Sequence, residues 1–171
     1  TAPVQKAEAE TPTAENMLET AQLLLNHGRT DAAINLLEKV VAENAQLASA
    51  HCLLARAHAN LGQWAQSRLW CEKALAIDPL LPEVYDLLAM VEEQNGRLEP
   101  AIDNLKKLIY LDPARPLAHF NLAVLYKKRS QVDLAQRALK NTLTRIQALP
   151  ADNIIPDSGH TTVQRLSEAA Q

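Results

Sequence analysis

Aromatic residues, glycine and cysteine are scarce in this chain of 171 residues, and it contains no long uncharged apolar run. Aromatic side chains make up 4% of the sequence and there are four glycines, whereas 47% of the residues are hydrophobic. This composition argues against a β-sandwich and favours a core of leucine and alanine between helices. No segment approaches the roughly eighteen apolar residues of a membrane-spanning helix, and none has the pattern of a signal peptide.

The chain also lacks the positive charge of a nucleic-acid-binding domain. It carries 17 lysine and arginine residues against 20 aspartate and glutamate residues, a net charge of −3. Binding to nucleic acid depends on a basic surface that neutralises phosphates, so we expect no nucleic-acid partner. Because no apolar run is long enough, we expect no membrane insertion either.

Cysteine and histidine, which often serve in catalysis or metal binding, are few, and their spacing does not match a known site of either kind. Cys52 and Cys71 are the two cysteines and form no CxxC motif, so neither a disulfide nor a metal site is expected. His51 and His58 share a helix face, but no third ligand of suitable spacing follows. Neither a glycine-rich phosphate loop nor the order of a catalytic triad is present. We therefore predict no catalysis, no bound metal and no cofactor within these residues.

What the sequence does contain is a fixed period. Gly28, Gly62 and Gly96 are equally spaced, and the pair Asp78-Pro79 recurs at the same interval as Asp112-Pro113. Small residues keep this interval through four copies in two series: Ala21, Ala55, Ala89 and Ala123, and Ala33, Ser67, Ala101 and Ala135. Agreement of several signals in phase indicates four copies of one helix-turn-helix unit.

Each repeated residue has a physical role in such a unit. Glycine at the end of the first helix reaches the left-handed conformation of the turn without a steric penalty. Small side chains let the two helices approach closely. Proline after aspartate ends the second helix, whereas Pro82 and Pro116 suit the first turn of the next helix, where a missing N–H leaves no bond unmade. His51 and His119 both occupy the fourth place of their units, where we expect them to pack.

From residue 14 to residue 146 this pattern resembles the tetratricopeptide repeat (TPR) family. The resemblance implies an all-α fold, a right-handed α-solenoid of four helix pairs with a C-terminal capping helix. We place the four units at 14–47, 48–81, 82–115 and 116–149. Residues 1–13 are predicted to be a disordered linker, because they hold one large aliphatic residue and bury too little surface to order themselves. The chain starts with Thr1 rather than Met, which suggests a fragment or a processed form.

The fourth unit departs from the pattern. Ser130 replaces the turn glycine, and Gln147 stands where proline is expected. The second helix of this unit should therefore run on to about Ala148, and residues 149–152 should break it.

Residues 150–171 are predicted to form a loop and a capping helix. A capping box from Thr161 to Gln164 opens this helix. Its apolar side chains should cover the otherwise bare face of the last unit, as terminal repeats require. The residues expected to do so are Val163, Leu166 and Ala169 or Ala170.

We expect the function to lie on the concave face, because the first helices of the units line that face in such a solenoid. The predicted partner-binding residues are Gln22, Asn26, Arg56, Asn60, Glu83, Asp86, Met90, Gln94, Phe120, Asn121, Val124, Lys127 and Lys128. Phe120, Met90 and Val124 form an apolar cluster that indicates either a contact with the partner or packing of Phe120 against the cap.

Some TPR grooves grip the terminal carboxylate of a chaperone with lysine, asparagine and arginine at set places. The corresponding positions here are Leu18, Gln22, Leu53, Glu83 and Leu87. That clamp is absent, and a carboxylate would be repelled near Glu83 and Asp86.

A closer resemblance rests on Tyr110–Pro113 (YLDP), Ala118–Phe120 (AHF), the spacing of Ala138, Leu139 and Asn141, and the helix after Gly159. These features resemble the C-terminal TPR region of CheR-type chemoreceptor methyltransferases. The resemblance implies a parent enzyme that uses S-adenosylmethionine to methylate receptor glutamates in a cytoplasmic bacterial chemosensory pathway, one governing biofilm or surface growth. The catalytic domain of that parent would precede Thr1, so none of its catalytic or cofactor residues is expected here.

By this resemblance the partner is a chemoreceptor or the parent's own catalytic domain. Two other functions stay open. One is a free-standing TPR scaffold, such as a pilus or secretion assembly factor, and the other is a module that associates with its own copies.

Overall fold

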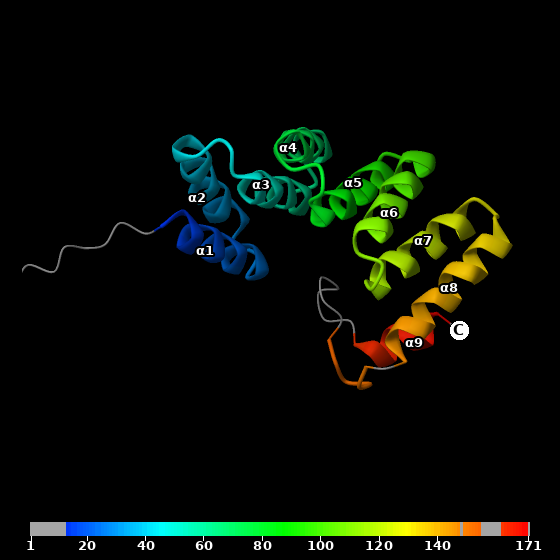
Figure 1. Ribbon diagram of the computed structural model, residues 1–171. Coiled ribbons are helices and arrows are strands. Elements are labelled where there is room, and N and C mark those ends of the chain that lie inside the picture. Colours follow the sequence, from blue (N-terminus) through cyan, green and yellow to red (C-terminus); the bar gives the residue numbers. More distant parts are fainter. Residues whose placement is uncertain (1–12, 148, 155–161, 171) are drawn as a thin grey trace, which may run out of the picture.

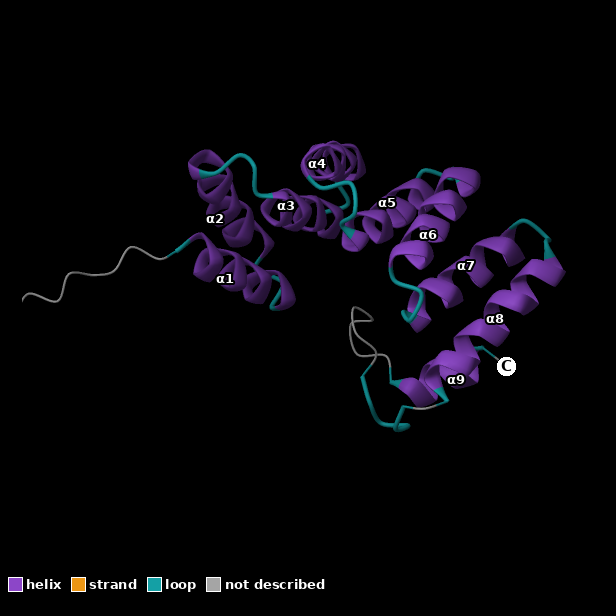
Figure 2. Cartoon of the chain, in the orientation of Figure 1, coloured by secondary structure: helices purple, strands orange, loops and turns teal. Residues whose placement is uncertain are grey.

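The computed structural model describes residues 13–147, 149–154 and 162–170 (Figure 1). Within these ranges it contains nine α-helices and no β-strand, as Figure 2 shows. The helices are α1 (Ala14–Asn26), α2 (Thr30–Glu43), α3 (Ala48–Asn60), α4 (Trp64–Ile77), α5 (Pro82–Gln94), α6 (Leu98–Leu111), α7 (Pro116–Lys128), α8 (Val132–Ile146) and α9 (Val163–Ala169). The predicted all-α fold is confirmed, whereas the predicted linker falls almost wholly outside the described residues.

The first eight helices form four pairs that follow one another along an arc (Figure 1). Each helix packs on the next one in the chain, and α3 also touches the first helices of the pairs on either side, α1 and α5. The first helices of the pairs start where the four units start in the sequence, at Ala14, Ala48, Pro82 and Pro116. The fold is the predicted right-handed α-solenoid.

A residue in the left-handed conformation follows the first helix of every pair. Its φ is +71° at Gly28, +69° at Gly62 and +73° at Gly96, and Ser130 takes the same place with a φ of +59°. The next residue donates its N–H to a carbonyl five positions back, which satisfies a group that the helix end would leave unpaired. The fourth unit thus keeps the turn without glycine and carries the steric cost of a Cβ in this conformation.

Small residues lie where the helices meet. All eight members of the two small-residue series are buried, from no exposure at Ala21 and Ala33 to 6% at Ala135. Large aliphatic side chains, Leu37 and Leu105 among them, are buried in the clusters that these residues belong to. Because a close-packed contact has no room for added methylenes, the small residues set the distance between helices.

A buried carboxylate joins the second and third pairs. Glu92 in α5 is 3% exposed, and its two oxygens meet guanidinium groups of Arg68 in α4, at 3.1 Å, and of Arg97 after α5, at 2.6 Å. A buried carboxylate is costly unless cations balance it, so both arginines are needed for this arrangement. The ion pair with Arg68 connects α5 to α4, and the ion pair with Arg97 connects α5 to the turn that follows it.

The fourth residue of the first helix ties each of the last three units to the turn before it. Its side chain hydrogen-bonds with the backbone carbonyl oxygen six residues earlier. The pairs are His51 Nε2 with Ala45 (2.9 Å), Tyr85 Oη with Pro79 (2.8 Å) and His119 Nε2 with Pro113 (3.1 Å). The two histidines are buried, and in addition to packing they close the turn between units.

The helix α9 packs against α8 and covers the last pair (Figure 1). Of its predicted contact residues, Val163, Leu166 and Ala170 are buried. Val163 and Leu166 form one cluster with Ile146, and the cluster is surrounded by the partly buried Leu117, Phe120 and Leu143. The predicted capping helix is therefore present. The prediction that α8 reaches about Ala148 was too long, since α8 ends at Ile146.

The predicted capping box of α9 is one residue out of register. The N-cap is Thr162, whose Oγ1 accepts a hydrogen bond from the backbone N–H of Arg165 at 3.3 Å. Thr161 lies outside the described residues. The preceding loop explains the register, because the N–H of Gln164, which a cap at Thr161 would use, donates instead to the carbonyl of Ala151 at 2.9 Å.

Exchanging the turn residue at two equivalent places should change stability in opposite directions. We expect Ser130→Gly to raise the free energy of unfolding by about 0.5–1 kcal/mol and Gly62→Ala to lower it by about 1 kcal/mol. A Cβ on Gly62 would meet nothing within 4 Å, so only the backbone conformation is tested there. Urea unfolding followed by circular dichroism measures both changes, and shifts of the same sign would contradict the assigned role of the turn.

His119 should make the fold sensitive to acid. Burial, the largest influence, and the nearby Arg145 guanidinium lower the pKa of His119 below its ordinary 6.5, against the opposite influence of the bond to Pro113. The native state therefore favours the neutral ring. The stability that depends on this neutral form is fully present above pH 6.5 and is lost as the pH falls through the lowered native pKa.

The variant His119→Tyr should remove this sensitivity, because Tyr85 makes the same bond at the equivalent place without titrating at acid pH. We expect the variant to lose less stability than the natural chain between about pH 7.5 and pH 5. Urea unfolding at several pH values is the measurement, and an equal loss in both proteins would show that His119 does not carry the effect.

Candidate functional site

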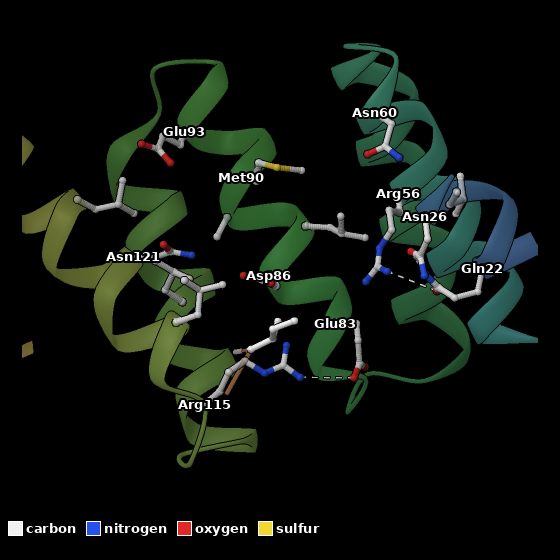
Figure 3. Close-up of a pocket in the computed structure, with 17 residues that line it drawn as sticks. Gln22, Asn26, Arg56, Asn60, Glu83, Asp86, Met90, Glu93, Arg115 and Asn121 are labelled. Atoms are coloured by element: carbon white, nitrogen blue, oxygen red, sulfur yellow. Dashed lines mark hydrogen bonds and ion pairs between the residues drawn. The ribbon is translucent and has the colours of Figure 1, made fainter. Parts of the chain in front are cut away.

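An open groove of about 970 Å³ lies on the concave side of the array, and Figure 3 shows its side chains. The first helices of the four pairs supply most of its walls. Its floor contains apolar side chains, including Leu25, Leu87 and Leu125, and polar side chains project above them. One further wall residue, Ile154, follows α8 and lies outside the repeats.

Eight of the thirteen predicted partner-binding residues line this groove. They are Gln22, Asn26, Arg56, Asn60, Glu83, Asp86, Met90 and Asn121. They share one face because equivalent positions recur: Gln22, Arg56 and Met90 are one repeat apart, as are Asn26 and Asn60. Of the eight residues predicted on the first three pairs, all except Gln94 line the groove.

Besides the apolar floor, three lining residues were missed from the sequence. Glu93 follows Asp86 by two helical turns on α5, and this spacing was a usable signal. Arg115 lies in the turn before α7, where a helical pattern has no bearing. Ile154 lies beyond the last repeat, and no periodicity points to it.

Five predicted residues do not line the groove: Gln94, Phe120, Val124, Lys127 and Lys128. Four of them lie on α7, whose groove-lining residues are Leu117, Asn121 and Leu125. Leu117 and Asn121 lie one repeat after Glu83 and Leu87, which also line the groove. Phe120 and Val124 lie one repeat after Asp86 and Met90 but do not line it, so the repeat frame holds for only part of α7.

Phe120 is one of these five, and the cap explains its place. It is partly buried in the cluster of Ile146, Val163 and Leu166, so it packs against α9. The sequence allowed Phe120 either to contact a partner or to pack against the cap, and in the structure it packs against the cap.

Ion pairs balance most of the charge in the groove. Arg115 contacts the carboxylates of Glu83 at 3.6 Å and Asp112 at 3.0 Å. Glu93 is paired with Lys128, which therefore influences the groove from its rim. With both signs of charge, several amides and an apolar floor, the groove suits a stretch of polypeptide better than a small, highly charged ligand.

The cysteines and buried histidines are held in structural positions. Burial raises the pKa of Cys71 to about 12, with smaller contributions from Cys52 and Glu72, so this thiol stays protonated. The ring of His51 lies against Trp70, with 5.4 Å between the ring centroids. Among the side chains that the structure describes, no three histidine, cysteine, aspartate or glutamate residues are grouped so as to hold a metal ion.

Two models of one protein family match adjoining parts of the chain. One, described as tetratricopeptide repeat, matches residues 24–91, and the other, described as TPR repeat, matches residues 91–129. Together they cover more than half of the 171 residues. The chain belongs to the tetratricopeptide repeat family. It is a TPR protein-interaction module, and in its described ranges no helix has the length and apolar character required to cross a membrane.

Solved structures share the TPR fold over most of the chain. A crystal structure of MamA has a TM-score of 0.71 at 22% identity and covers 81% of each chain. MamA from Desulfovibrio magneticus RS-1 also has a TM-score of 0.71, at 19% identity, over 84% of this chain and 81% of that one. A thermophilic TPR protein of Thermus thermophilus has a TM-score of 0.66 at 26% identity, over 77% of this chain and 74% of that one.

One curated relative is an enzyme by name. It is the "Probable biofilm formation methyltransferase WspC" of Pseudomonas putida (strain KT2440), and 79 aligned residues are 30% identical. The alignment covers 46% of this TPR chain and 19% of WspC. The chain thus matches about a fifth of that protein's length.

Phe120→Ala should lower stability, because it removes a partly buried ring from the contact between the last pair and α9. We expect a loss of about 2 kcal/mol, less than a fully buried phenylalanine would cost. Met90→Ala is the matched control, since Met90 lines the groove and is 37% exposed, and it should change stability by no more than about 0.5 kcal/mol. Thermal unfolding compares the two variants, and equal melting temperatures would show that Phe120 does not stabilise the contact with α9.

Proposed function

We propose that this TPR module is the regulatory or targeting C-terminal domain of an S-adenosylmethionine-dependent methyltransferase that modifies chemoreceptor glutamates in the bacterial cytoplasm. The alignment with WspC carries this proposal, because that protein is named as a probable biofilm formation methyltransferase. S-adenosylmethionine and the catalytic residues belong to the parent's catalytic domain. The module itself binds a protein, either a chemoreceptor or that catalytic domain.

The geometry supports a role in tethering. The groove draws on all four helix pairs and is open along its length, so an extended or helical segment of a partner fits it. A domain that binds near a receptor raises the effective concentration of the enzyme at its substrate glutamates without contributing a catalytic group. The same contact made with the parent's catalytic domain would regulate access to that domain.

A free-standing TPR scaffold, such as a pilus or secretion assembly factor, is the second candidate. It is favoured by the mutual coverage with MamA, since each chain covers 81% of the other and the array therefore makes up most of that chain as well. A self-associating module is a separate alternative and would appear in sedimentation velocity as a mass that rises with concentration.

The deciding experiment uses the native protein from its source. Its intact mass is measured, then its binding of S-adenosylmethionine by calorimetry, and then methyl transfer to membranes that contain chemoreceptors. A protein much larger than this chain that binds the cofactor is the expected result. A native species of about this size that does not bind it would overturn the methyltransferase assignment in favour of the scaffold.

Groove variants of the full-length protein test the role of the module. We expect Asn26→Arg combined with Asn60→Arg to slow receptor methylation by about tenfold, because two bulky cations then project from exposed positions of the groove. The affinity for S-adenosylmethionine should not change. Arg137→Glu, at an exposed position of α8, is the control and should have no effect. Unchanged methylation in the double variant would move the partner site away from the concave face.

A further inference from the structure

One apolar position of the repeat is exposed in the first pair and buried in every later pair. Leu23 is 58% exposed, whereas its equivalents in the later repeats, Ala57, Val91 and Leu125, are at most 1% exposed. In those units the position packs against the preceding pair. In α1 of the described chain no preceding pair covers it.

Leu23 borders an apolar hollow beside the groove. The hollow has a volume of about 680 Å³ and lies between α1, α3 and the turn before α5. Its walls are mainly Leu18, Leu53 and Leu81, with Cys52 between them. Exposed apolar surface in a concavity of this kind is the usual receptacle for an anchoring side chain of a partner.

One cation stands where the hollow meets the groove. Arg56 lines both and is half-buried, and its side chain donates to the side-chain oxygen of Gln22 at 3.4 Å (Figure 3). No carboxylate of the described residues forms a close ion pair with it, whereas the groove carboxylates Glu83 and Glu93 are paired with Arg115 and Lys128.

An anion next to Arg56 is best placed on the side of the hollow, because Asp86 lines the groove but not the hollow. Glu19 and Glu83 also border the hollow, but Glu19 is exposed on α1, where water screens it, and Glu83 is engaged by Arg115. A half-buried guanidinium with a neutral partner gains most from a carboxylate, which its planar donors bind through two parallel bonds.

We infer that the hollow receives a large apolar side chain of the partner and that Arg56 pairs with an aspartate or glutamate next to that side chain. This inference rests on the proposed function, since it assumes that the groove binds a protein segment. It assigns the partner's binding segment a chemistry, an apolar residue adjacent to an acidic one. A terminal carboxylate is not required.

The polar character of the neighbouring surface argues against a second copy as the occupant. In the later units, the residues of the first helix that pack on the preceding pair are apolar. At one such position, α1 has Thr20 where the next two units have Leu54 and Leu88. One helical turn earlier, α1 has Asn16 where the second unit has Ala50. End-to-end stacking of another array would bury these polar groups, whereas a peptide in the hollow leaves them in water.

Selection from a random library of short peptides displayed on phage tests the inference, with the chain immobilised. We expect the bound peptides to be enriched in leucine, isoleucine or phenylalanine next to aspartate or glutamate. The same selection on Arg56→Glu should lose this acidic preference. A set of peptides without the acidic neighbour, or one that Arg56→Glu leaves unchanged, would overturn the inference.

A double-mutant cycle then measures the contact with one synthetic peptide from the selection. Replacing its acidic residue by the corresponding amide should weaken binding to the natural chain by about tenfold and to Arg56→Gln by much less. Leu23→Ser should weaken binding of the peptide severalfold. Leu69→Ser, on α4 and likewise partly exposed at 44%, is the matched control and should have no effect.

The two proposals fail in different ways. If the selected peptides bind equally well to the chain with Asn26→Arg and Asn60→Arg, the groove is not the binding site. The proposed function would then have no identified binding surface. If that double variant abolishes binding while Arg56→Gln and Leu23→Ser do not, the groove stands and the hollow is not its anchor site.

Discussion

The close approach of the helices at the small residues is the constraint on which the rest of this molecule depends. The positions represented by Ala21 and Ala33 lie at the contact surfaces of the helices in all four pairs, and a larger side chain there would separate the backbones. The distance between the helices fixes the rotation from one pair to the next, and that rotation bends the array into an arc. The groove exists because the small added rotations all have the same sign.

The parts that could be predicted from sequence are those that repeat. The starts of the first helices and the burial of the small residues follow from positions that recur once in every unit. Most polar groove residues of the first three pairs follow from the same recurrence, although Glu93 does not. The prediction was incomplete where periodicity has no meaning, as at Arg115 in a turn and Ile154 after the last helix pair. Phe120 and Lys127 follow the same frame but do not line the groove, and Phe120 packs against α9 instead. Whether Phe120 faces a partner or the cap depends on contacts that are distant in the sequence, and no local pattern contains them.

The segment after α8 links stability and recognition. Leu166 and Val163 cover the end of the array, and the N–H of Val163 is bonded to the carbonyl of Asn153, next to Ile154 in the groove wall. Ile154 and Thr162 are also paired by a backbone bridge. The cap that protects the last pair from water therefore also positions a residue that a partner would touch. Variation in this segment alters both properties together.

The buried Glu92 has a consequence for the length of the groove. In an array in which each pair touches its neighbours, the distance between the two ends is set by the angles at the joints between pairs. A change of angle at the middle joint moves the ends farther relative to each other than the same change at a terminal joint, because both arms are then long. The ion pair of Glu92 with Arg68 crosses that middle joint. By restraining the joint, this ion pair limits changes in the spacing over which a single bound segment can contact the first pair and the last.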